Sequence, residues 1–333
     1  MSSAPGSNEI WHDARWLAQA LDPKAGLLRA VELTAEDYRQ ASFLDDRLLE
    51  AGHRNHLLNW AEIEHGRPDN ARSDARWIFH IGHVGSTLVS RLLGELDGVL
   101  SIREPRALRD LTFFPREVRD MFVPTARALM SRTFTKDGAA VVKATSMVSE
   151  IAAELVGEKG RALFLHASAD TYMRTILAGD SSPAELQTLT QFYRARAARA
   201  GIEFGDPLTS QAKVAALVWA CEMTALESAA ERLPGEAVSW TDFDEFLDRP
   251  AAQLEALCQF FDLMNEPGEV ARIAEGPLMN RYSKALEYEF GAEARRRQLA
   301  DAGKTHSEEI ASALAMLIQA AEKAPLLARA LLR

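Results

Sequence analysis

The sequence predicts an α/β fold in three layers, with a parallel sheet covered by helices on both faces. Short apolar runs alternate with helical segments from residue 77 onward, which is the pattern of strands joined by helical crossovers. The runs are mostly apolar and suit strands that are buried on both faces. A glycine turn joins the first run to the next helix, and so places a helix N-terminus beside the end of a strand.

Five strands are expected, at 77–81, 99–102, 140–143, 162–166 and 237–240. Helices are expected at 86–96, 116–133, 145–157 and 169–178, with a helical insertion at about 184–232. The pattern is helical again from residue 242, with a less regular stretch near 276–292. Ligands bind at the carboxyl ends of strands in open α/β sheets, so the residues just after each run are the candidate site.

Residues 1–70 are expected to form a helical cap that packs on the main domain, which spans 71–333. Turn-forming residues break this segment near Pro23 and Pro68, and Thr34 followed by Asp37 is typical of a helix start. The segment carries no recognisable chemistry.

The composition is that of an ordinary globular protein of 333 residues, with a net charge of 38 − 48 = −10. This acidic balance argues against non-specific binding to nucleic acid, so an anionic ligand needs a local site. Cys221 and Cys258 are the two cysteines and lie in apolar, helical surroundings. We therefore expect buried free thiols and no metal site.

The first residues lack a basic stretch followed by an apolar run, so no secretory signal is expected. No apolar segment reaches the roughly 18 residues that a membrane span needs. A cytoplasmic protein is the resulting expectation, and the sequence leaves its oligomeric state open.

The glycine turn after the first strand is the strongest candidate site. Gly82 and Gly85 allow a tight turn, and Ser86 and Thr87 open a helix whose free N–H groups and dipole attract an anion. A nucleoside-triphosphatase loop also needs Gly and Lys where this chain has His80 and Ser86. We therefore expect a phosphate-bearing ligand other than ATP with magnesium.

Charged residues follow the second and third strands. Glu104 lies close to Arg103 and Arg106 along the chain, which suits either a general base held ionised by guanidinium groups or a surface ion-pair cluster. Lys143 ends the third strand, where it is placed to neutralise charge on a phosphate or on a leaving sulfate.

Two further strand ends carry weaker signals. His166 ends the fourth strand and Arg174 follows on the next helix, although a single histidine at a strand end is more often structural than ligand-binding. Acidic residues after the fifth strand fit a helix N-terminus. Lys284 lies in a loop-like region from which it can fold over a ligand.

Taken together, these strand ends resemble the sulfotransferase family, over about residues 77–284. The loop at 79–93 is similar to the family's loop for the 5′-phosphosulfate of PAPS (3′-phosphoadenosine 5′-phosphosulfate), most of all in a bacterial branch that reads G-R-C-G-S-T-L-L. Segment 101–105 resembles the family segment whose glutamate serves as base, and 238–263 resembles a later family stretch. The resemblance implies a P-loop-like fold, PAPS as co-substrate, no metal, and a small-molecule acceptor with a hydroxyl or an amine.

The resemblance also assigns roles to residues of this chain. Glu104 would accept the proton of the acceptor, and Lys143 and His83 would neutralise charge on the leaving group. The residues implied in binding PAPS are Gly82, His83, Val84, Gly85, Ser86, Thr87, Leu88, His166, Arg174 and Lys284.

The chain departs from the family at several positions. His83 replaces the Arg or Lys of the loop, His166 replaces the Arg of the 3′-phosphate site, and Arg174 stands at a Ser position. Histidine is only partly cationic at neutral pH. The leading hypothesis is therefore a PAPS-dependent sulfotransferase-like enzyme. The alternative is a protein of the same fold that binds a nucleotide or phosphate ligand without transfer, and a kinase-like enzyme is third, since the loop lysine is missing.

Overall fold

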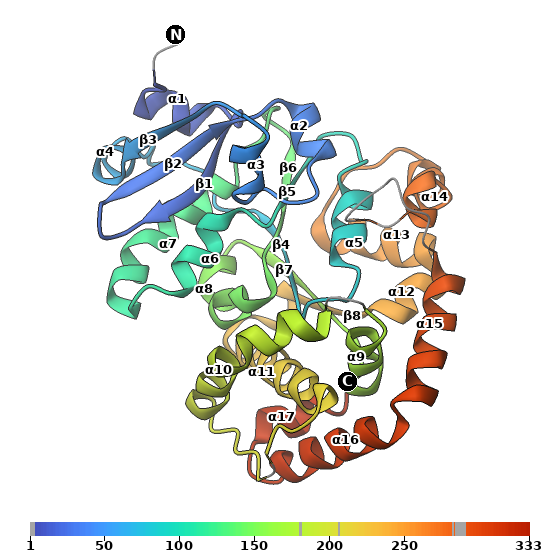
Figure 1. Cartoon of the computed structure of the whole chain (residues 1–333). Helices are drawn as coiled ribbons and strands as arrows, with labels where there is room; N and C mark the ends of the chain where they lie inside the picture. The colour runs from blue at the N-terminus through green and yellow to red at the C-terminus, as the bar shows by residue number, and fades with distance from the viewer. Residues whose placement is uncertain (1–3, 180–181, 206, 282, 284–290) are drawn as a thin grey trace.

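The computed structural model describes residues 4–179, 182–205, 207–281, 283 and 291–333 (Figure 1). The main sheet consists of β4 (Arg76–His80), β5 (Val99–Arg103), β6 (Ala139–Lys143), β7 (Arg161–His166) and β8 (Val238–Asp242). Its strands are parallel and lie in the order β5-β6-β4-β7-β8. The predicted α/β fold and its five strands are confirmed, with strand ends within two residues of those expected.

Helices flank this sheet. Those between the strands are α5 (Ser86–Leu93), α6 (Arg106–Thr112), α7 (Arg116–Met130), η1 (Ser146–Ile151), α8 (Ala152–Val156), α9 (Ala169–Leu177), α10 (Ser182–Arg199), α11 (Gln211–Arg232) and η2 (Gly235–Ala237). Those after the last strand are α12 (Phe243–Asp248), α13 (Pro250–Phe261), α14 (Glu269–Ala274), η3 (Pro277–Asn280), α15 (Ala292–Thr305), α16 (Ser307–Ala321) and α17 (Pro325–Ala330). The helical block expected at about 184–232 consists of two helices, α10 and α11.

Crossover handedness decides which helices cover which face of the main sheet. The chain passes from β4 to β5 in one direction, and from β5 to β6, β6 to β7 and β7 to β8 in the other. Because such connections are right-handed, α5 lies on one face and α7, α8 and α11 on the other. Accordingly α5 packs on β5 and β6, whereas α8 contacts β4, α7 and α11. The carboxyl end of β4 is therefore the topological switch point, where ligands bind in open α/β sheets.

Strands β4 to β7 of the main sheet are mostly buried, whereas the edge strand β8 is partly exposed. Trp77, Phe79 and Phe164 are each fully buried, as expected for a sheet covered on both faces. The pairing sets Arg103 beside Lys143 on neighbouring strands. All five carboxyl ends consequently meet at one edge of the sheet.

The N-terminal segment differs from the expectation. Its helices are α1 (Ser7–His12), α2 (Ala35–Gln40), α3 (Arg47–Glu50) and α4 (Trp60–His65), but it also contains the strands β1 (Trp16–Asp22), β2 (Leu27–Glu32) and β3 (Asn55–Asn59). These strands form an antiparallel sheet in the order β1-β2-β3. The helical reading of residues 8–66 is therefore wrong for three segments.

Local propensity explains the error. β1 is rich in alanine and leucine, which are good helix formers, and tertiary pairing overrides that preference. The break at Pro23 is a hairpin turn, in which the carboxylate of Asp22 accepts hydrogen bonds from the amides of Lys24 and Ala25, both at 3.0 Å. The predicted helix start at Thr34 is confirmed by a capping box with Asp37.

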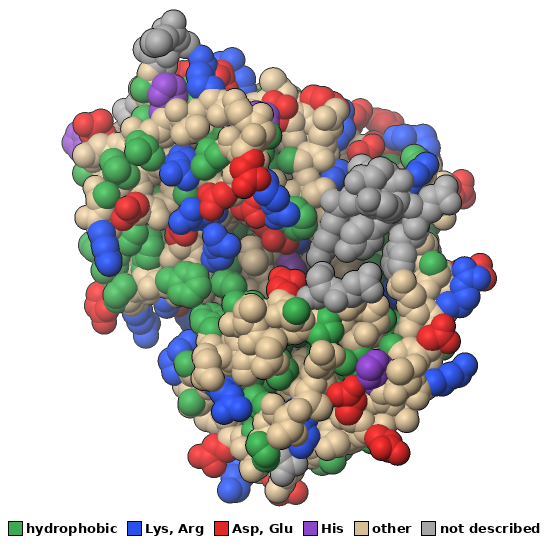
Figure 2. All heavy atoms as spheres, in the orientation of Figure 1, with side chains coloured by type: hydrophobic (Ala, Val, Ile, Leu, Met, Phe, Trp, Pro, Cys, Tyr) green, Lys and Arg blue, Asp and Glu red, His purple; other side chains and the backbone are tan. Residues whose placement is uncertain are grey.

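The N-terminal extension, residues 4–70, packs on the main domain beside α6 and α7 (Figure 1). The amide of Leu21 donates to the Asp110 carboxylate at 2.9 Å, and the Arg132 guanidinium donates to the carbonyl of Trp16 at 2.7 Å. On the face shown in Figure 2, the described Lys and Arg side chains of the extension alternate with Asp and Glu and form no basic patch.

Both cysteines are free and buried, as expected. Across the part of the chain that the structure describes, no helix combines the length and the apolar character that crossing a membrane requires. The same part of the chain contains no group of three or more metal-ligating side chains.

Candidate active site

The loop after β4 turns sharply at the topological switch point. Gly82, His83 and Gly85 have φ angles of 84°, 55° and 64°, and Gly85 is the N-cap of α5. In a turn that contains left-handed residues, successive backbone N–H groups can converge on a concave site for an anion. The first N–H groups of α5 have no partner within the helix, and its dipole adds positive potential. The loop can therefore hold a phosphate or sulfate group.

Three other elements close around this loop. A Cβ added to Gly85 would lie 1.9 Å from the ring of Phe243, so glycine is needed both for its φ angle and for its lack of a side chain. A Cβ on Gly82 would lie 3.7 Å from the hydroxyl of Ser146 and 4.0 Å from that of Tyr172. The loop is thus enclosed by α12, η1 and α9.

Hydroxyl groups near the loop are unsatisfied. Among the described residues, Thr87 Oγ1 and the Tyr172 hydroxyl are buried and lack a hydrogen-bond partner. Burial raises the pKa of Tyr172, so its hydroxyl keeps its proton as a donor. Buried polar groups are normally hydrogen-bonded. Two orphaned hydroxyls beside an anion-binding loop fit a phosphate-bearing ligand.

Glu104 and Lys143 form an ion pair beside the loop. The Lys143 side chain is fully buried, that of Glu104 is 14% exposed, and the ammonium group contacts Glu104 Oε1. Glu104 has a φ angle of 54°, which is strained for a residue with a side chain. Its amide donates to the carbonyl of Lys143 at 2.7 Å, and Thr145 Oγ1 lies 3.5 Å from its second oxygen.

His80 joins the ion pair to the loop. Its Nδ1 accepts a hydrogen bond from the amide of Gly82 at 3.0 Å, and its Nε2 lies 2.8 Å from the carbonyl of Ala144. A ring whose Nδ1 accepts and whose Nε2 donates is the neutral Nε2–H tautomer. Nε2 is also 3.9 Å from Glu104 Oε1. One imidazole therefore spans the distance between the anion loop and the carboxylate.

The expected guanidinium neighbours of Glu104 are engaged elsewhere, so that interpretation is wrong. Arg103 is 1% exposed and donates to the carbonyl of Ala41 at 2.8 Å. Arg106 binds the Asp46 carboxylate at 2.8 Å. Successive side chains of a strand point to opposite faces, and their direction changes again where a helix begins. Arg103 and Arg106 are therefore close to Glu104 in sequence, but their guanidinium groups point elsewhere. The cation that pairs with the Glu104 carboxylate is instead Lys143, on the neighbouring strand.

His166 and Arg174 both contact neighbouring side chains, although His166 Nδ1 is buried without a hydrogen-bond partner among the described residues. His166 is 4% exposed and packs edge-on against Trp240, with ring centroids 5.6 Å apart. Burial lowers the pKa of His166, which opposes a cationic role, although Asp242 acts in the other direction. Arg174 pairs with Asp170 on its own helix at 2.7 Å. Their assignment to a 3′-phosphate site stays a prediction.

A cavity of about 570 Å³ opens beside the loop. A volume of this size suits a nucleotide-sized ligand. His83, Gly85 and Leu88 line one side, and residues of α9, α10, α12, η3 and α15 and of the loops beside them line the rest. Val84, Ser86 and Thr87 are buried next to it. Lys284, expected to close over the ligand, lies outside the described residues.

Arg295 of α15 also lines this cavity. Its side chain is 8% exposed, its Nε binds the Asp244 carboxylate at 3.0 Å, and its guanidinium lies 5.2 Å from the centre of the Phe243 ring. One terminal nitrogen of Arg295 is buried without a hydrogen-bond partner among the described residues. A buried, half-satisfied guanidinium is a strong anchor for a phosphate.

Sequence reasoning missed Arg295, His80 and Tyr172 as site residues. The run of three arginines at 295–297 was a usable signal, because such a run on a helix places one member on the buried face. His80 was noted only as a departure from the triphosphatase pattern. Tyr172 gave no signal, since a tyrosine in an amphipathic helix is ordinarily a core residue.

No known family model matches the chain, and no curated protein matches it. Among solved structures, it is similar to the sulfotransferase domain from the curacin biosynthetic pathway, at 14% identity and a TM-score of 0.41, over 73% of this chain and 97% of that one. It is similar to the sulfotransferase domain of the Synechococcus PCC 7002 olefin synthase, at 10% identity and a TM-score of 0.42, over 72% and 97%. It is also similar to mouse sulfotransferase SULT7A1 complexed with PAP, at 8% identity and a TM-score of 0.37, over 78% and 89%. Structural similarities this weak carry no argument about function. Any such argument must come from the geometry of the site.

Proposed function

We propose that the chain is a transferase that moves a sulfuryl group from PAPS to a hydroxyl or amine of a small-molecule acceptor. The observation that carries this proposal is the His80 bridge, which links the anion loop to the Glu104–Lys143 pair. A phosphate-binding loop alone would serve many ligands. A carboxylate and an ammonium group held at the same strand edge add the acid–base and electrostatic groups that group transfer needs.

The residues present fit the donor. The loop amides and the orphaned Thr87 hydroxyl would hold the 5′-phosphosulfate, and Arg295 would hold a second anionic group in the cavity. Phe243 and Leu88 supply apolar surface for a base. His83 also lines the cavity, while His166 lies buried against Trp240.

PAPS supplies an activated sulfuryl group with PAP as the leaving group. The acceptor oxygen or nitrogen bonds to sulfur as the bond from sulfur to the bridging oxygen breaks. Glu104 accepts the acceptor's proton, and the Lys143 ammonium offsets the negative charge that grows on the bridging oxygen. Their ion pair holds both groups at the strand edge.

Calorimetry with PAP tests the donor assignment directly. We expect binding, and the absence of binding at millimolar PAP would sink the assignment. Turnover is then measured as PAP released from PAPS in the presence of a panel of phenols, alcohols and amines. Glu104→Gln should lower that release by about 10²–10⁴-fold and leave the affinity for PAP intact.

The second candidate is a protein of the same fold that binds a nucleotide or phosphorylated ligand without transfer. The buried position and lowered pKa of His166 favour it, because a neutral imidazole is a poor phosphate partner. The two candidates separate in the same assay. A protein that binds PAP, yet releases none from PAPS with any acceptor of the panel, supports the second.

A further inference from the structure

Phe43 belongs to the N-terminal extension, yet its ring lies at the ion pair of the main domain. The ring centroid is 5.7 Å from Lys143 Nζ. An ammonium group this close to an aromatic ring is attracted by the electron-rich face, and the attraction grows when water is excluded. Lys143 is fully buried, so the contact occurs where that attraction is strong.

The backbone fixes Phe43 in this place. The next residue, Leu44, is fully buried, and its amide donates to the carbonyl of Arg103 at 2.7 Å. Arg103 is the last residue of β5 and directly precedes Glu104. The segment that carries Phe43 is therefore hydrogen-bonded to the strand end that carries the carboxylate.

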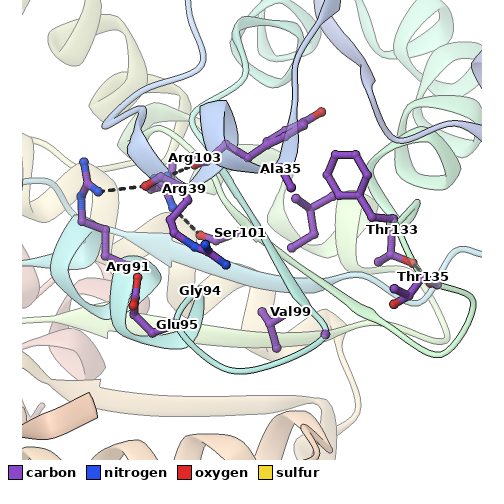
Figure 3. Close-up of a pocket in the computed structure, with 14 residues that line it drawn as sticks. Ala35, Arg39, Arg91, Gly94, Glu95, Val99, Ser101, Arg103, Thr133 and Thr135 are labelled. Carbon is purple, nitrogen blue, oxygen red and sulfur yellow. Dashed lines mark hydrogen bonds between the residues drawn. The ribbon is translucent and has the colours of Figure 1, made fainter. Parts of the chain in front are cut away.

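Two buried guanidinium groups hold the residues before Phe43. Arg103 Nε donates to the carbonyl of Ala41 at 2.8 Å, and Arg91 donates to the carbonyl of Gln40 at 2.9 Å and to the Ser42 hydroxyl at 2.8 Å. Figure 3 shows Arg91 and Arg103 converging, from α5 and β5, on the end of α2. Cations are favoured at a helix C-terminus, whose carbonyl groups they satisfy.

A second cation packs on the same ring. The Arg47 guanidinium lies 3.7 Å from the Phe43 centroid and is held by Asp45, with Nε 2.7 Å from Oδ1. The ring therefore contacts both Arg47 and Lys143, and the backbone next to it is held at Leu44.

We infer that Phe43 is a positioning residue for Lys143, so that the N-terminal extension completes the active site. This inference rests on the proposed sulfuryl transfer. Phe43 holds the ammonium group toward the leaving group and keeps water from the Glu104–Lys143 pair. It acts through Lys143 and takes no part in bond making, so its loss should lower kcat more than it raises KM.

The first experiment compares Phe43→Leu with Phe43→Tyr, which keeps the aromatic face. Phe43→Leu should lower kcat about tenfold and change the calorimetric affinity for PAP less than about twofold, while Phe43→Tyr should restore kcat. Phe113→Leu is the matched control, because Phe113 is 59% exposed and is the C-cap residue after α6. Equal kcat in Phe43→Leu and wild type would overturn the inference.

The second experiment needs no turnover. In protein with ¹³C-labelled lysine, the ε-methylene protons of Lys143, assigned with Lys143→Arg, should resonate upfield because of the Phe43 ring. Phe43→Tyr should keep the shift, and Phe43→Leu should remove it. A wild-type signal without an upfield shift contradicts the inference even if Phe43→Leu does not fold. If wild type neither binds PAP nor turns over PAPS, the proposed function fails. The chemical shift of the Lys143 ε-methylene protons still reports, independently, whether Phe43 contacts Lys143.

Discussion

Glu104 and Lys143 pair across neighbouring strands, one at the end of β5 and one at the end of β6. The register that sets Arg103 beside Lys143 brings the next residue, Glu104, within reach of the ammonium group. Glu104 also adopts a φ angle of 54°, so the fold holds it in a strained conformation at this point. Strain of this kind persists where surrounding structure over-determines it, and it is common at active sites.

Breaking this pair should cost stability as well as activity. Lys143→Met should lower the free energy of unfolding by about 3–5 kcal/mol, because it leaves a largely buried carboxylate without its partner. Glu104→Gln should lower turnover by about 10²–10⁴-fold, the range for loss of a general base. Urea denaturation and PAP release measure the two effects.

A double-mutant cycle separates the pair from other losses. Glu104→Gln combined with Lys143→Met should recover part of the stability lost in Lys143→Met alone, since no unpaired charge remains. Glu117→Gln on α7 is the control for loss of a carboxylate away from the site. Additive losses in the double variant would show that the two side chains are not coupled.

Gly85 should be irreplaceable for two separate reasons. Its φ angle is 64°, and an added Cβ would lie 1.9 Å from the Phe243 ring. Gly26 has a φ angle of 63° and nothing within 4 Å of the added Cβ, so it isolates the first reason. Gly26→Ala should cost about 1–2 kcal/mol from left-handed strain alone. Gly85→Ala should cost more and should also weaken PAP binding, as urea denaturation and calorimetry can measure.

The double variant Gly85→Ala with Phe243→Ala tests the second reason, which is the lack of space between residue 85 and the Phe243 ring. Removing the ring should return the cost of the alanine toward that of Gly26→Ala. If Gly85→Ala and Gly26→Ala cost the same in the presence of Phe243, the ring does not restrict the loop.

Much of the fold followed from the sequence because parallel strands leave a strong pattern. Runs such as 77–81 are mostly apolar and are followed by turn residues, so their class and position were recoverable. The strand at 16–22 was not, since its alanines and leucines favour a helix and only pairing with β2 makes it a strand.

The site was recoverable only in part. Glu104 and Lys143 were candidates because both lie at strand ends, and the structure pairs them. The partner of Glu104 was misjudged, because adjacency to Arg103 in sequence says nothing of side-chain direction. Phe43 and Arg295 reach the site from opposite ends of the chain. Contacts over such separations depend on how the extension and α15 pack, which no local pattern encodes.

Arg295 should anchor the nucleotide. Arg295→Met removes a buried guanidinium with an unsatisfied nitrogen, and should weaken PAP binding by about 1.5–3 kcal/mol, the range for hydrogen bonds to charged groups. Arg296→Met is the matched control, because the Arg296 side chain is 66% exposed. Calorimetry should find Arg296→Met close to wild type. Equal affinities in both variants would place the nucleotide elsewhere.

His166 should make stability depend on pH. Burial lowers its pKa in the folded protein below the value of about 6.5 expected when unfolded, with Asp242 opposing and Arg333 reinforcing the shift. The unfolded chain then binds the proton first as pH falls. The contribution of neutral His166 to the free energy of unfolding is therefore fully present above about pH 6.5. It is lost as pH falls through the pKa of the folded protein, by at most about 1.4 kcal/mol per pH unit.

His166→Gln removes the titrating group and so tests this origin. The free energy of unfolding is measured in urea from pH 5 to pH 8 for both proteins, and the difference between them should be constant above about pH 7 and shrink below it, because only wild type loses the contribution of His166. Parallel curves over the whole range would mean that His166 titrates alike in the folded and unfolded states. The same data bear on function, because a histidine that resists protonation in the folded protein cannot supply the positive charge that a 3′-phosphate needs at neutral pH.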